Sequence, residues 1–157
     1  MNIYHIYTDG SCRNNGTSKA VGAWGYVAYQ NDTKIFEKVD TSQNNITNQR
    51  AELCGVINAC LWGAAMIKDH PFDEIHIYTD SAYVHNCQSQ KWYESWQNNG
   101  WLNSKKQDVA NKDLWEQLIP FFNNIQFHFH KVVGHANNIK NNYIDALVQQ
   151  ASLRCKK

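Results

Sequence analysis

Strand-like and helix-like patterns follow one another along this chain in an order that few folds accommodate. Three segments with the two-residue alternation of strands come first, separated by short polar links. Helical spacing and further strand-like segments then alternate to the end. Strands joined by short links pair antiparallel, whereas strands separated by helices add in parallel through right-handed crossovers. The order predicts an α/β domain with a mixed five-stranded sheet, three antiparallel strands followed by parallel ones, flanked by helices.

The element boundaries follow from the same patterns. Strands are expected over residues 2–8, 20–30, 33–39, 74–79 and 125–133. Helices are expected over residues 48–68, from Asp80 or Ser81 onward, over 112–122 and over 142–153. Turns are expected at Asp9-Gly10, which would end the first strand, and at Asn31-Asp32. Residues 91–111 read as irregular, with room for one further helix, and no linker divides residues 1–157, so a single domain is expected.

The composition is that of a folded protein. Hydrophobic residues make up 43% of the 157 and charged residues 18%, which argues against disorder. No run of about 18 apolar residues occurs, and the first residues lack the pattern of a signal peptide. The five cysteines are scattered without a Cys-x-x-Cys pair, which argues against a cysteine zinc site. We expect a cytoplasmic or otherwise intracellular monomer with no membrane partner.

Four acidic residues fall at junctions between the expected elements: Asp9, Glu52, Asp80 and Asp145. Ligands of α/β sheets bind beyond strand ends, where helices begin. Carboxylates that converge there repel one another unless cations hold them, and oxygen ligands suit hard ions such as Mg²⁺. Two such ions about 4 Å apart activate a water and stabilise the leaving oxygen of a phosphodiester.

Each acid also has a purely structural interpretation. Asp9 suits a turn, Asp80 suits a helix N-cap, and Glu52 near a helix start suits the helix dipole. Asn142-x-x-Asp145 resembles a capping box. For any one of them alone the structural interpretation is the stronger, and their joint occurrence favours function.

Four segments resemble the motifs of type 1 ribonucleases H. In the family's order they are residues 7–12 (YTDGSC), 47–53 (TNQRAEL) and 78–84 (YTDSAYV), then Gly134-His135-Ala136 followed by Asp145. The resemblance spans roughly residues 3–153. It implies the ribonuclease H-like fold and an endonuclease that hydrolyses the RNA strand of RNA–DNA hybrids. It also implies a two-metal-ion mechanism that leaves 5′-phosphate and 3′-hydroxyl ends.

The resemblance also assigns the catalytic group. Asp9, Glu52, Asp80 and Asp145 match the ligands of two Mg²⁺ ions, for which Mn²⁺ is an alternative. His135 matches the family's catalytic histidine, a helper in proton transfer or product release, although a lone histidine there is more often an ordinary loop residue. Asn142 stands where the family often has an acidic residue, which removes a negative charge near the metals.

Recognition of the RNA strand requires contact with the 2′-hydroxyl. Asn15, Asn48 and Gln49 match positions that contact the RNA strand in the family. The structural alternative is that Asn15-Gly16 forms a turn and that Asn48 or Gln49 caps or starts a helix.

Binding of the DNA strand is expected at two places. Thr47 and Asn111 match positions that help hold a DNA phosphate, although an Arg found near this pocket in some members is replaced by Asn45 or Ile46. Asn111 could equally be a helix N-cap. Residues 91–112 resemble the family's basic protrusion, which grips DNA through lysines and aromatic rings; the residues expected to do so here are Lys91, Trp92, Trp96, Lys105 and Lys106. The alternative for the two Trp residues, stronger for Trp96, is inward packing that anchors a surface helix.

Two other functions remain open. A transposase- or exonuclease-type nuclease would share the fold but place its acids in different sequence contexts. A non-catalytic hybrid-binding module would need more positive charge than the net +1 of this chain and would not need four acids.

Overall fold

The computed structural model describes residues 1–132 and 138–155. The sheet has five strands in the order β3-β2-β1-β4-β5. Their bounds are β1 Ile3–Arg13, β2 Val21–Gln30, β3 Thr33–Ser42, β4 Glu74–Thr79 and β5 Phe127–Lys131. β1 to β3 pair antiparallel, whereas β4 pairs parallel with both β1 and β5. The predicted mixed sheet is confirmed.

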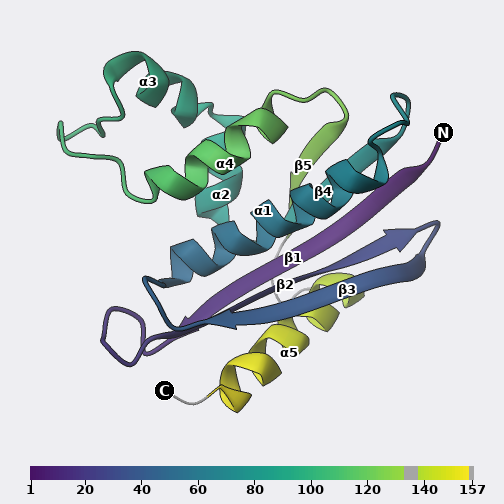
Figure 1. The fold of residues 1–157 in the computed structure, drawn as a ribbon, viewed down its shortest axis with the longest axis horizontal. Helices are drawn as coiled ribbons and strands as arrows, with labels where there is room; N and C mark the ends of the chain where they lie inside the picture. Colours follow the sequence, from purple (N-terminus) through teal and green to yellow (C-terminus); the bar gives the residue numbers. More distant parts are fainter. Residues whose placement is uncertain (133–137, 156–157) are drawn as a thin grey trace.

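Five helices occur in the described part of the chain, namely α1 Asn48–Met66, α2 Ala82–Ser89, α3 Trp92–Asn99, α4 Lys112–Phe122 and α5 Ile139–Arg154. In Figure 1, α1 and α4 lie on one side of the sheet and α5 on the other, while α3 and its following loop project away from the sheet. Among the described residues, no helix is both long and apolar enough to cross a bilayer.

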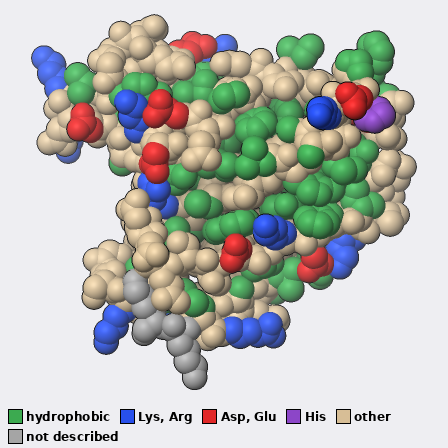
Figure 2. All heavy atoms as spheres, viewed as in Figure 1, with side chains coloured by type: hydrophobic (Ala, Val, Ile, Leu, Met, Phe, Trp, Pro, Cys, Tyr) green, Lys and Arg blue, Asp and Glu red, His purple; other side chains and the backbone are tan. Residues whose placement is uncertain are grey.

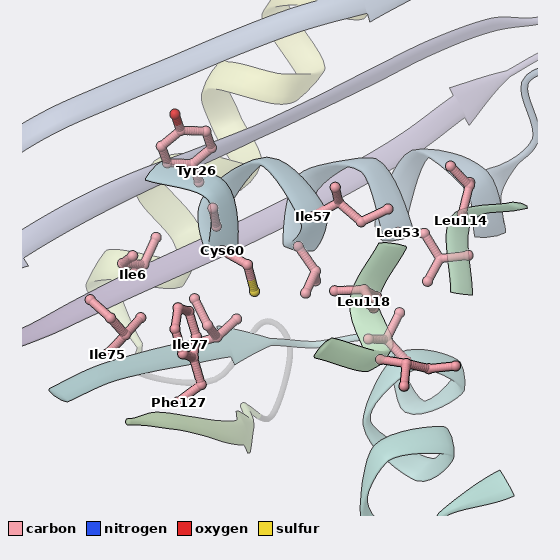
Figure 3. Close-up of a cluster of buried hydrophobic side chains, with 14 of the residues drawn as sticks. Ile6, Tyr26, Leu53, Ile57, Cys60, Ile75, Ile77, Leu114, Leu118 and Phe127 are labelled. Atoms are coloured by element: carbon pink, nitrogen blue, oxygen red, sulfur yellow. The ribbon is translucent and has the colours of Figure 1, made fainter. Parts of the chain in front are cut away.

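The main core lies between the sheet and α1. Side chains of α1, α4 and the central strands meet there, among them Leu53, Ile57, Ile75, Ile77 and Leu118, as Figure 3 shows. A smaller core forms on the opposite face, where Ile144 and Val148 of α5 pack against Ala23 and Val27 of β2. The two cores fix α1 and α5 on opposite sides of β1.

The predicted turn at Asp9-Gly10 is wrong. β1 continues through both residues, with Asp9 opposite Gly25 and Gly10 opposite Trp24 of β2. Gly10 serves close packing instead, because a Cβ there would lie 2.4 Å from the backbone carbonyl carbon of Ala51 in α1. The glycine therefore lets the start of α1 rest directly on β1. The hairpin turn at Asn31-Asp32 is confirmed, with positive φ angles of 52° and 63°.

One helix prediction needs correction, and one optional helix is present. α5 begins at Ile139 rather than at residue 142, since Asn138 caps it by accepting a hydrogen bond from the backbone N–H of Asn141. The further helix for which residues 91–111 had room is present as α3, with the left-handed residues Lys91 before it and Gly100 after it.

Candidate active site

Asp9 is the most enclosed of the predicted catalytic acids, with 7% of its surface exposed. It lies in the middle of β1, the central strand of the sheet. The alternation of β1 points Tyr4, Ile6 and Thr8 toward the α1 face, so Asp9 points toward the α5 face. There it forms a side-chain hydrogen bond with Asp145 of α5.

The other acids approach Asp9 from three elements. Asp80 directly follows β4, the parallel neighbour of β1, and it raises the pKa of both Asp9 and Glu52 through charge repulsion. Glu52 lies in the second turn of α1 and accepts a short hydrogen bond from the Ser81 hydroxyl. The described structure thus brings Asp9, Glu52, Asp80 and Asp145 to one region of the molecule.

None of the four acids has the structural role that its local sequence suggested. The cap of α1 is Thr47, that of α2 is Ser81 and that of α5 is Asn138. Neither α1 nor α5 has an acidic residue in its first turn. Asp145 lies in the second turn of α5, so the capping-box interpretation of Asn142-x-x-Asp145 is wrong.

The site disfavours the ionised form of its carboxyl groups when no cation is bound. Burial, then Asp80 and Asp145, raises the pKa of Asp9 to about 8. Burial also raises the pKa of Glu52, and Asp80 adds to this, although the Ser81 hydrogen bond opposes it. A crowded set of carboxyl oxygens with raised pKa values fits hard divalent cations, because a cation offsets the repulsion that otherwise favours protonation.

A pH dependence of stability follows for the metal-free protein. The folded state keeps a proton on Asp9 that the unfolded chain loses, since the pKa rises from 3.8 to about 8 on folding. Stability should therefore fall as the pH rises between about 4 and 8. Asp9→Asn should remove this slope and stabilise the metal-free protein at pH 8 by about 1–2 kcal/mol. Urea unfolding in EDTA at several pH values measures the pH dependence of stability and the stabilisation by Asp9→Asn. If stability falls with pH equally steeply in the wild type and in the variant, the expectation is refuted.

Two of the residues predicted to contact RNA lie side by side. The Asn15 side-chain oxygen accepts a hydrogen bond from the backbone N–H of Asn48, with a nitrogen–oxygen distance of 3.2 Å. The Asn48 side-chain oxygen in turn accepts one from the backbone N–H of Cys12 at 2.6 Å. The turn after β1 is thereby fastened to the start of α1, three residues before Ala51 packs on Gly10. Asn48 starts the helix, as its alternative interpretation holds.

Gln49 and Asn111 also meet, at the far side of the α1 N-terminus. The Asn111 amide donates to Gln49 Oε1 at 3.4 Å and to the Tyr83 hydroxyl at 3.0 Å. Asn111 occupies the N-cap position of α4 but its side chain makes no capping hydrogen bond. Arg50 joins the start of α1 to the start of α4 through a bidentate ion pair with Asp113, with nitrogen–oxygen distances of 2.9 and 2.7 Å. Thr47, by contrast, uses its hydroxyl to cap α1.

The predicted basic protrusion comprises α3 and the loop that follows it. Lys91, Lys105 and Lys106 are exposed, and Figure 2 shows Lys and Arg side chains around the outer end of this region. Trp96 packs inward, with its ring 5.7 Å from the rings of both Trp101 and Trp115. Trp92, with its ring 6.3 Å from that of Trp96, is half-buried like Trp96, and both pack against the main core, so the anchoring interpretation describes both residues.

The remaining predicted residue, His135, lies outside the described residues. Sequence reasoning gave no role to Ser81, Tyr83 and Arg50, which orient Glu52, Asn111 and the α1–α4 junction respectively. Ser81 and Arg50 lie within the segments that resemble the family's motifs, each directly beside a predicted site residue. This proximity is the sequence feature that could have identified them.

Comparisons with known proteins agree on one family. A family model described as RNase H matches residues 1–153. A ribonuclease H of Syntrophomonas wolfei is 42% identical over 147 residues, which is 93% of each chain. One of Clostridium botulinum is 37% identical over 146 residues, again 93% of each chain.

Solved structures show the same fold. A foamy viral protease-reverse transcriptase in complex with an RNA/DNA hybrid superposes with a TM-score of 0.79 at 21% identity, covering 97% of this chain and 20% of that one. The RNase H1 of Halobacterium salinarum gives 0.62 at 25% identity, with 95% and 96% covered. With the family model and the relatives each spanning nearly the whole sequence, this chain belongs to the ribonuclease H family of nucleases.

Proposed function

We propose that this protein is an endoribonuclease that hydrolyses the RNA strand of RNA–DNA hybrids with two Mg²⁺ ions, leaving 5′-phosphate and 3′-hydroxyl ends. The observation that carries the proposal is the approach of Asp80 and Asp145 to the buried Asp9, since burial and then these two acids raise the pKa of Asp9 to about 8. Membership of the ribonuclease H family and the hybrid bound by the foamy viral neighbour support the choice of substrate.

Asp9, Glu52, Asp80 and Asp145 would hold the metal. When bound there, such ions would supply Lewis-acid chemistry, namely activation of a water and stabilisation of negative charge on the phosphate and the leaving oxygen. The protein's own contribution is placement. β1 holds Asp9, and the end of β4 fixes the position of Asp80, which directly follows that strand. The Ser81 hydroxyl holds the Glu52 carboxylate through a hydrogen bond. In the proposed reaction His135 moves a proton or assists product release.

We assign discrimination between the RNA strand and the DNA strand to residues on two sides of the N-terminus of α1. Asn15, Asn48 and Gln49 would contact the RNA strand, where short polar side chains reach the 2′-hydroxyls of a wide minor groove. The Asn111 amide nitrogen lies 3.4 Å from Gln49 Oε1. A DNA-strand contact at Asn111 and Thr47 would therefore lie beside the RNA-strand contact at Gln49. The exposed lysines of the protrusion would continue along the DNA strand.

The direct test is cleavage of an end-labelled RNA–DNA hybrid with Mg²⁺, beside duplex DNA, duplex RNA and single-stranded RNA. We expect cleavage only of the RNA in the hybrid, with products that a ligase requiring 5′-phosphate ends can rejoin. Equal cleavage of duplex DNA would favour the transposase-type alternative. Binding of the hybrid without cleavage in Mg²⁺ or Mn²⁺ would favour the binding-module alternative.

The DNA-strand assignment predicts an effect on binding rather than on chemistry. Changing Lys91, Lys105 and Lys106 together to Ala should raise KM for the hybrid about tenfold, leave kcat nearly unchanged and flatten the salt dependence of binding. The matched control changes three exposed basic residues elsewhere, namely Lys38, Lys68 and Arg154. Equal effects of the two triple variants would show that net charge, and not the protrusion, governs binding.

A further inference from the structure

Four of the seven histidines lie together on one face of the sheet. His5 of β1, His76 of β4, and His128 and His130 of β5 alternate with buried or half-buried residues that face α1. They therefore point toward the opposite face, where α5 packs against β1, β2 and β3. All four are half-buried, so solvent reaches them.

Three side chains of this face converge on one point. His76 and His128 are directly paired in the register of β4 and β5, and their rings stack with centroids 4.6 Å apart. Glu74, two residues before His76, places its Oε1 atom 3.0 Å from His128 Nε2 and 3.6 Å from His76 Nε2. The ligand atoms of the three residues all lie within 4.8 Å of one another.

The two separations from the Glu74 oxygen are close to those of a metal-coordination polyhedron. A tetrahedral zinc ion with bonds of about 2.0–2.1 Å separates its ligand atoms by about 3.3 Å. The observed separations of 3.0 and 3.6 Å from the Glu74 oxygen lie on either side of this value. A separation of 3.6 Å is also too long for a hydrogen bond, so the approach of His76 to Glu74 is not explained by one.

A fourth residue orients one of the proposed ligands, His76. His76 Nδ1 lies 2.8 Å from His130 Nε2, and the bond between them admits two tautomers. When His76 donates from Nδ1, its Nε2, which lies 3.6 Å from Glu74 Oε1, carries a lone pair that can bind a metal. Metal-bound histidines have this arrangement, in which the other ring nitrogen donates to a fixed acceptor.

We propose that Glu74, His76 and His128 form a second metal site, distinct from the four carboxylates, that takes a divalent transition-metal ion such as Zn²⁺. Imidazole nitrogens favour borderline ions, whereas sets of carboxylate oxygens favour Mg²⁺, so the two sites select different metals. The site joins β4 to β5. Its His76 lies four residues before Asp80, or about 13 Å along the strand.

The test is Zn²⁺ titration of the full chain in excess Mg²⁺, with a chromophoric chelator as competitor and imidazole ¹⁵N spectra as the readout of position. We expect Zn²⁺ to shift Nε2 of His76 and His128 and to raise Tm. His76→Gln and His128→Gln should each lower the affinity at least about 100-fold, and His130→Gln about 10–100-fold.

Two controls separate this site from others. His70→Gln changes an exposed histidine outside the cluster and should leave the affinity unchanged. Asp80→Asn should also retain Zn²⁺ binding, since it alters only the carboxylate site. Unshifted His76 and His128 nitrogens, or equal Zn²⁺ affinity in the wild type and the His128→Gln variant, would overturn the proposal. Such a result would mean that Glu74 only pairs with His128, whose Nε2 lies 3.0 Å away.

Discussion

Asp80→Asn should lower the rate of hybrid cleavage on the order of 10³-fold or more, equivalent to about 4 kcal/mol of transition-state stabilisation. The amide keeps the shape of the side chain but removes the charge that would bind the metal. Asp80 raises the pKa of both Asp9 and Glu52. Its neutralisation should therefore relieve repulsion, and the variant should be at least as stable as the wild type without metal.

Steady-state cleavage of the hybrid, together with urea unfolding, measures both effects. Asp69→Asn is the matched control, since it removes an exposed carboxylate just beyond α1 and should leave cleavage unchanged. An active Asp80→Asn variant, or one that loses activity only because it unfolds, would contradict the assignment of Asp80.

Gly10→Ala should have the largest effect on stability, with a loss of about 3 kcal/mol or more. The new Cβ would lie 2.4 Å from the carbonyl carbon and oxygen of Ala51 and 2.5 Å from the backbone nitrogen of Glu52. These are backbone atoms of α1, so no side-chain rotation relieves the collision. The helix must move, and Glu52 moves with it, so cleavage should also fall.

The control for this substitution is Gly100→Ala. A Cβ at Gly100 meets nothing within 4 Å, but the residue has a φ of 79°. The left-handed conformation should cost about 1–2 kcal/mol without any collision. Thermal and urea unfolding of both variants measures the difference; equal losses would show that α1 does not rest on β1 at Gly10.

The fold was predictable where local pattern and tertiary role agree. Residues 74–79 and 112–122 were predicted with the bounds that β4 and α4 have. The predictions failed where packing decides. Asp9-Gly10 has the composition of a turn, yet Gly10 lies within β1 because α1 approaches it closely. The start of α5 was misplaced because Asn138, and not Asn142, accepts the capping hydrogen bond.

The site was predictable through its motifs rather than through local chemistry. Each acid had an adequate structural explanation from sequence, and only the arrangement of β1, β4, α1 and α5 removes those explanations. Contacts between distant segments, such as Asn15 with Asn48 and Gln49 with Asn111, depend on tertiary packing that no local pattern encodes. The same holds for the histidine face, because β4 and β5 are separated by three helices in the sequence.

The most direct test of the carboxylate site is the titration of Asp9, followed by carboxyl ¹³C NMR with and without Mg²⁺. Without metal the pKa of Asp9 should lie near 8, because burial and the charges of Asp80 and Asp145 disfavour ionisation. Saturating Mg²⁺ should lower this pKa by about two units or more, since a bound cation favours the carboxylate. A pKa near the ordinary value of 3.8 that does not respond to Mg²⁺ would contradict a metal site built on Asp9.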